Sequence, residues 1–142
     1  MDNNIDVLDE LNKGCCMGVD ALEFILEKTD EPKFKKLLEK QLIEYKDLSS
    51  RIHELYNDYS NGNIHETNLM TKAMTWYGIQ KDTILDSSVS NLADLLIRGT
   101  NMGIVEGKKL LNNKTMDKKV HKICSEYITM QEAYLDKLKE YL

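Results

Sequence analysis

The chain holds a single proline and only seven glycines among its 142 residues. Glycine and proline clusters mark the frequent turns of all-β folds, so their scarcity excludes an all-β or loop-rich chain. No stretch approaches the roughly 20 consecutive apolar residues that a membrane-spanning helix needs. The first residues, Met-Asp-Asn-Asn, lack the basic and apolar pattern of a secretory signal, so we expect no secretion by a cleaved peptide.

Cysteine pairs and net positive charge are also lacking. The three cysteines are an odd number, and two of them, Cys15 and Cys16, are adjacent, which excludes a disulfide framework and favours a cytoplasmic location. The 24 acidic residues outnumber the 19 basic ones, and the net charge of −5 predicts that nucleic acid is not a partner. The proportions of charged residues (30%) and hydrophobic residues (42%) are typical of one globular domain, which we place at residues 1–142.

Helical periodicity is what the sequence does contain. Apolar residues recur every three or four positions in four long segments, which predicts amphipathic helices at about 4–28, 32–59, 83–111 and 115–142. Turn residues at 29–32 and 112–114 predict short first and last links, and Asp82 and Thr115 are the expected caps of the third and fourth helices. Gln41 and Gln131 lie on the apolar stripes, where we expect hydrogen-bonded core positions.

The second and third helices are joined by a much longer link, residues 60–82. It contains an amphipathic stretch at about 68–79, which predicts one short helix. A helix of about 28 residues is about 42 Å long, a distance that this link can span. The sequence therefore predicts an all-α bundle of four helices, with a long crossover between two helical hairpins.

The two predicted hairpins resemble each other in sequence. Residues 14–19 align with residues 99–104, and both segments contain the pattern Gly-x-x-Met-Gly. After a shift of one residue, the second and fourth helices align as well. The pattern predicts one two-helix unit used twice, related by a pseudo-twofold axis. Small residues four apart let helices approach closely, so we expect close packing at Gly14, Gly18, Gly99 and Gly103.

With short first and third links and one long second link, the chain resembles the ferritin-like (rubrerythrin-like) superfamily of four-helix bundles. Residues 14–18 and 74–79 also look like parts of small bundle proteins of Gram-positive anaerobic bacteria. The resemblance implies a ferritin-like bundle. In the di-iron members of that superfamily, two helices each supply a Glu and the other two each supply a Glu-x-x-His motif that binds the metals.

The sequence contains no Glu-x-x-His, because Ser50, Gly62 and Lys118 stand three positions before its three histidines. We therefore predict no di-iron centre and no cofactor. The cysteines, His121 and the carboxylates near the middle of the bundle are expected to be ordinary core or surface residues, but two alternative roles stay open. One is a zinc site formed by Cys15, Cys16, His121 and Cys124. The other is a site for a hard cation formed by carboxylates near the middle of the bundle. These carboxylates are Asp20, Glu23, Glu44, Asp47 and Asp94.

Motifs of nucleophilic catalysis and of phosphate-binding loops are absent from the sequence, so we assign no catalytic residue. We predict a non-enzymatic structural or protein-interaction module, and the alternative is a metal-binding or redox protein with a divergent carboxylate site. The wide apolar surface of the crossover helix predicts a homodimer; methionines folded over the bundle ends are the other interpretation. The predicted interface residues are Leu69, Met70, Met74, Trp76 and Tyr77.

Lysines cluster near both predicted short turns, at 33–40 and at 108–122. We expect the two turns to lie at the same end of the bundle, which would make that end basic. The simplest interpretation of such an end is a solvated surface near helix termini, and the alternative is a contact with an anionic partner.

Overall fold

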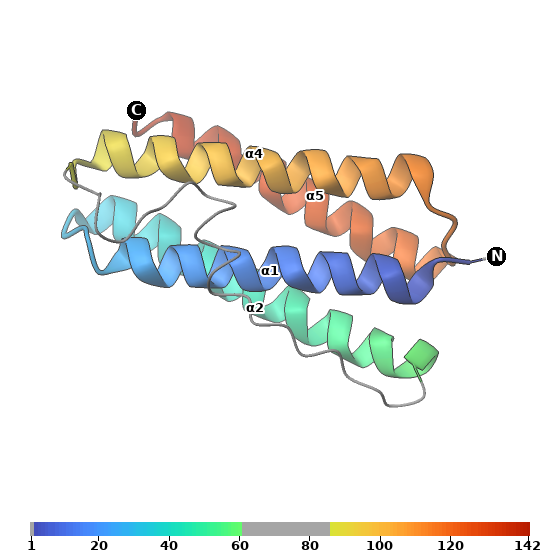
Figure 1. Ribbon diagram of the computed structural model, residues 1–142. Helices are drawn as coiled ribbons and strands as arrows, with labels where there is room; N and C mark the ends of the chain where they lie inside the picture. Colours follow the sequence, from blue (N-terminus) through green and yellow to red (C-terminus); the bar gives the residue numbers. More distant parts are fainter. Residues whose placement is uncertain (1, 61–85) are drawn as a thin grey trace.

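The computed structural model describes residues 2–60 and 86–142 of the chain (Figure 1). These residues form four long helices: α1 (Asn4–Leu26), α2 (Pro32–Ser60), α4 (Val89–Asn113) and α5 (Lys118–Lys139). The all-α class with four long helices is therefore confirmed. The predicted short helix at 68–79 lies outside the described residues.

Local hydrogen bonds explain where the helices begin. Glu31 precedes Pro32 and accepts a bond from the backbone N–H of Phe34 at 2.6 Å, so it satisfies one of the free donors at the start of α2. Ser88 does the same for α4, because its Oγ accepts a bond from the N–H of Asn91 at 3.3 Å. The α4 helix thus begins at Val89, later than the expected residue 83, and the expected cap Asp82 lies outside the described residues.

The start of α5 also differs from the expectation. The helix begins at Lys118 rather than at 115, and Asp117 occupies the cap position. Thr115 is instead paired with the start of the chain: its carbonyl accepts from the N–H of Asn3 at 2.6 Å, and its N–H donates to the Asn3 side chain at 3.2 Å. These long-range bonds, which no local sequence pattern reveals, keep Thr115 outside the helix.

The helices α1 and α5 run in one direction, and α2 and α4 run in the other (Figure 1). The α1–α2 turn lies at the end of the bundle where the chain finishes, since the ring centroids of Phe34 and Tyr141 are 5.1 Å apart. The α4–α5 turn lies at the other end, beside Asn3. The expectation that both turns and their lysines share one end is therefore wrong. A crossover between two antiparallel hairpins reverses the second hairpin, so the two turns must point in opposite directions.

The core lies between the two hairpins, and their buried positions correspond. The seven buried residues of α4 each lie 85 positions after a buried residue of α1. Six buried residues of α2 likewise lie 86 positions before a buried residue of α5. The residues on α4 are Leu92, Ala93, Leu96, Gly99, Thr100, Gly103 and Gly107. The residues on α2 are Phe34, Leu38, Gln41, Tyr45, Leu48 and Ile52.

None of the helices in the described residues is long and apolar enough to span a membrane.

Candidate functional site between α2 and α5

A polar contact between buried side chains joins the two hairpins in the core. The hydroxyl of Tyr45 on α2 donates to Oε1 of Gln131 on α5 at 3.1 Å, and Nε2 of Gln131 lies 3.4 Å from the carbonyl of Tyr127. Both side chains are buried. Burying a polar group is tolerated when it is hydrogen-bonded, and here both ends of the Gln131 amide have partners. The prediction of a hydrogen-bonded core position is confirmed for Gln131.

The helix glycines make room for the side chains of this layer. A Cβ atom placed on Gly18 would lie 2.7 Å from the ring of Tyr45, and one on Gly103 would collide with the amide of Gln131. A Cβ on Gly14 would collide with the Tyr127 hydroxyl. These glycines therefore receive large side chains of a facing helix. A side chain at Gly14, Gly18 or Gly103 would thus collide with a facing side chain, and Gly99 is buried as well. The predicted close approach of the helix backbones at these four glycines stays a prediction.

The other stripe glutamine, Gln41, behaves differently. Its side chain is only 3% exposed, yet its Nε2 has no hydrogen-bond partner among the residues that the structure describes. The prediction of a hydrogen-bonded core position is therefore not met for this amide nitrogen within residues 2–60 and 86–142. Gln41 lies beside a cavity of about 220 Å³ between α2 and α5, which we call the Gln41 pocket. The pocket is lined by Leu37, Lys40, Gln41, Glu44, Thr129, Met130, Ala133, Tyr134 and Lys137.

Two further hollows follow between the same helices, toward the end of α2, and together we call them the α2–α5 groove. Both hollows are lined by Arg51. The one beside the Gln41 pocket, which we call the upper hollow, shares Glu44 and Met130 with that pocket, and the other is the lower hollow. The upper hollow is lined by Ile43, Glu44, Asp47, Leu48, Arg51, Glu126 and Met130. The lower hollow is lined by Arg51, Glu54, Leu55, Asp58, Lys119, Lys122 and Ile123.

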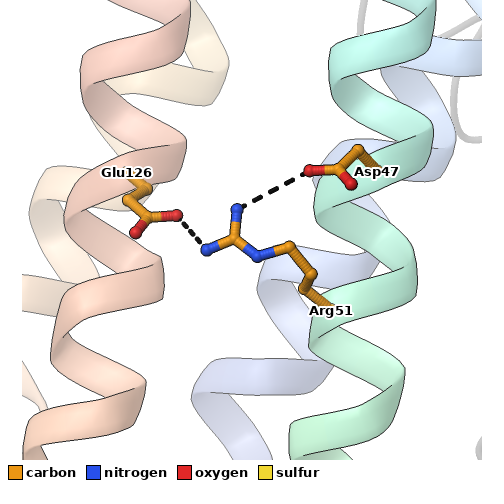
Figure 2. Close-up of polar contacts among 3 residues, drawn as sticks. All are labelled: Asp47, Arg51 and Glu126. Carbon is orange, nitrogen blue, oxygen red and sulfur yellow. Dashed lines mark hydrogen bonds and ion pairs between the residues drawn. The ribbon is translucent and has the colours of Figure 1, made fainter.

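Arg51 reaches across the groove from α2 to α5 (Figure 2). Its guanidinium pairs with Glu126 on α5 and lies 3.7 Å from the carboxylate of Asp47 on its own helix. The hydrogen bond to Glu126 is the main reason that the pKa of Arg51 is raised. The pair joins the two walls of the groove at one point, and because its side chains are partly exposed it contributes little to stability.

The two walls of the lower hollow differ in charge. The α2 wall carries Glu54 and Asp58, which we call the acidic edge, and the α5 wall carries Lys119 and Lys122, which we call the basic edge. All four residues are exposed. At the upper hollow, the apolar side chain of Ile43 is 68% exposed. The groove therefore combines an apolar rim with two edges of opposite charge.

The predicted cation ligands are not gathered at one point. Among the residues that the structure describes, no three carboxylate, imidazole or thiol groups form a cluster that could hold a metal. Most of the carboxylates are instead in exposed ion pairs: Glu23 with Lys46 at 3.5 Å, Asp47 with Arg51, and Asp94 with Arg98 at 3.2 Å. Asp20 is half-buried, and burial together with the charge of Glu23 raises its pKa, while Glu44 lines the Gln41 pocket.

The four residues considered as zinc ligands lie in environments that do not favour metal binding. Cys15 is fully buried in the apolar core, where burial raises the pKa of its thiol. Cys124 donates to the carbonyl of Gly107 at 3.8 Å, and burial raises its pKa to about 11. Cys16 lies 3.9 Å from the Asn12 side chain and also has a raised pKa, and His121 is exposed. A thiol must lose its proton to bind zinc, and these environments disfavour that loss.

The sequence did not reveal the groove. The groove is a gap between helices of different hairpins, so it exists only once the hairpins have packed together. The predicted dimer surface, Leu69, Met70, Met74, Trp76 and Tyr77, lies outside the described residues.

The sequence matches no protein-family model, and it has no significant match among curated proteins or solved structures.

Proposed function

We propose that this protein is a non-enzymatic, ferritin-like bundle that acts as a protein-interaction module and that pairs with a second copy of itself through the α2–α5 groove. The observation that carries the proposal is the groove itself, with an acidic edge on one wall, a basic edge on the other and an exposed isoleucine at its rim.

The ferritin-like part of the proposal rests on topology and burial. The antiparallel hairpins, reversed with respect to each other, are the arrangement expected of a bundle with one long crossover. The matching of buried positions between α1 and α4, and between α2 and α5, is what a duplicated two-helix unit would produce. Two of the three free cysteines are buried, which agrees with a cytoplasmic location where thiols stay reduced.

The charges of the groove favour a second copy as its occupant. A twofold axis parallel to the helices places α2 of one copy opposite α5 of the other, so each acidic edge meets a basic edge. Glu54 and Asp58 of one copy then face Lys119 and Lys122 of its partner, while Ile43 gains apolar contacts. Complementary edges of this kind set the orientation of two partners and disfavour other pairings.

A charge-swap experiment tests the pairing. One variant carries Glu54→Lys and Asp58→Lys, and a second carries Lys119→Glu and Lys122→Glu. Each variant alone places like charges at both contacts, so we expect a monomer in sedimentation equilibrium. An equimolar mixture restores opposite charges at both contacts, and we expect it to form a heterodimer as stable as the parent dimer.

The control variant carries Asp6→Lys and Glu10→Lys, which make the same change in net charge on α1, away from the groove. We expect it to remain dimeric. A parent protein that is monomeric even at millimolar concentration would refute the pairing. A parent dimer that survives both charge reversals would place the contact elsewhere, with the crossover surface at 69–77 as the remaining prediction.

A further inference from the structure

One face of α1 is buried where the corresponding face of α4 is open. Met17 and Met102 hold the same place in the repeated Gly-x-x-Met-Gly pattern, yet Met17 is 5% exposed and Met102 is 45% exposed. Ala21 and Phe24 continue the stripe of Met17 along α1 at helical spacing, and both are buried. We call Met17, Ala21 and Phe24 the Met17 face.

The corresponding positions of α4 suit contact with water. Glu106 and Lys109 stand where α1 has the other two residues of the Met17 face, and both are exposed and pair with each other at 3.4 Å. The two hairpins bury corresponding positions in the core, so the core gives α1 and α4 the same kind of neighbours. The difference between the two methionines therefore requires a cover that has no counterpart in the second hairpin.

Residues 61–85 lie between the two hairpins and have no counterpart in either. They begin beside the start of α5, because the Tyr59 hydroxyl near the end of α2 donates to Asp117 at 2.9 Å, and α4 starts at the opposite end of the bundle (Figure 1). A helix of 25 residues such as α4 is about 38 Å long, and residues 61–85 can reach about twice as far when extended.

The outer surfaces of the helices indicate which one this segment crosses. The α1 and α5 helices each pack against both α2 and α4, while α2 and α4 make little or no contact with each other. A chain from α2 to α4 therefore passes over α1 or over α5. The side of α5 that faces away from the core is exposed and polar, with His121, Lys122, Thr129, Glu132 and Asp136. Within α1, by contrast, the exposed residues are only Ile5, Asp6, Glu10 and Glu23.

We propose that residues 61–85 pass over α1 and that their apolar side chains dock on the Met17 face. The segment has the side chains that such a face needs, including Leu69, Met70, Trp76 and Tyr77. Because Met17 is already buried in a single copy of the chain, the occupant is this segment rather than a second copy. The contact uses neither wall of the α2–α5 groove, so this proposal and the proposed dimer can fail separately.

The fluorescence of Trp76 reports on the contact, since it is the one tryptophan of the chain. Met17→Lys places a charge in the covered face, so we expect the emission of Trp76 to shift to longer wavelength and acrylamide to quench it more strongly than in the parent. Met102→Lys makes the same change at the corresponding open position of α4, and we expect it to cause neither effect. Circular dichroism verifies that both variants keep their helices.

Methyl NMR tests the contact from the other side, without a substitution in α1. A variant with Trp76→Ala and Tyr77→Ala removes two aromatic rings from the segment. We expect the methyl signal of Met17 to shift and to become accessible to a soluble paramagnetic probe, while the methyl signal of Met102 stays unchanged. This measurement decides the question even if Met17→Lys fails to fold.

Three results would overturn the proposal. Unchanged Trp76 fluorescence in a folded Met17→Lys variant would show that the segment docks elsewhere. Equal effects of Met17→Lys and Met102→Lys would show that the segment has no preference for α1. Protection of Trp76 from acrylamide that appears only as the protein is concentrated would show that the cover comes from a second copy, as the predicted dimer surface at 69–77 implies.

Discussion

The two hairpins bury corresponding positions but fill them with different side chains. Gly18 of α1 and Gly103 of α4 correspond, and each receives a large polar side chain from its partner helix, Tyr45 in one hairpin and Gln131 in the other. Tyr45 and Gln131 themselves lie at corresponding positions, 86 residues apart, and are hydrogen-bonded to each other. One backbone arrangement therefore holds different polar groups at corresponding positions, and these two groups are complementary where the hairpins meet.

The two buried glutamines show what happens where that complementarity is missing. Gln131 lies in the central layer and has partners at both ends of its amide. Gln41 lies one turn before Tyr45 on α2, and its buried Nε2 has no partner in the described part of the chain. The same residue type on the same kind of apolar stripe thus connects the hairpins in one place and makes no such connection through its amide nitrogen in the other.

Substitutions at the buried glycines are expected to have the largest effect on stability. We expect Gly18→Leu and Gly103→Leu to lower the free energy of unfolding by about 1–3 kcal/mol or more each, because the new side chains would displace Tyr45 and Gln131. Urea unfolding measures the effect. Asn101→Leu, on the exposed side of the same α4 helix, is the control and is expected to change stability little. If either glycine variant were as stable as the parent, the close packing would be incorrect.

The central hydrogen bond is the next target. Tyr45→Phe removes the hydroxyl and leaves Oε1 of Gln131 without its donor, which we expect to cost about 1–2 kcal/mol. Gln131→Leu should be destabilising too, since it removes the bond that the buried Tyr45 hydroxyl makes across the hairpins. In a double-mutant cycle the combined variant should lose less than the sum of the two single losses. Strict additivity of the losses would contradict a direct interaction.

Replacing Gln41 is expected to raise the free energy of unfolding, whereas replacing Gln131 should lower it. Gln41→Leu replaces a buried amide, whose Nε2 has no partner among the described residues, by an apolar group of similar size, so we predict a gain of about 1 kcal/mol in the free energy of unfolding. Thermal unfolding of both variants tests this difference: we expect a higher melting temperature for Gln41→Leu and a lower one for Gln131→Leu than for the parent. A loss of stability in Gln41→Leu would indicate that the native amide is paired with water.

The smallest effect is expected at the surface. Arg51→Ala breaks the contact with Glu126 across the groove, and we predict a loss of less than about 1 kcal/mol because the side chains are partly exposed. The loss should shrink further in 1 M salt, where the screening length falls to about 3 Å. A large loss that does not depend on salt would mean that Arg51 contributes through packing of its stem rather than through its charge.

Much of the fold could be predicted from periodicity, and the errors occurred where distant residues meet. The start of α2 at Pro32 follows from local residues and was predicted. The start of α5 was placed too early, because the pairing of Thr115 with Asn3 brings together residues 112 positions apart. Buried polar positions could be named, but whether Gln41 or Gln131 would find a partner depended on the packing of one hairpin against the other.

The sequence by itself determined the helices and their amphipathic faces, because these follow from the spacing of residues along one helix. The tertiary structure decided which ends of the bundle the turns occupy, which glutamine is hydrogen-bonded and where a groove opens between α2 and α5. Those features are relations between helices that are far apart in the chain, and the pattern within any one helix holds no information about the side chains that face it from another.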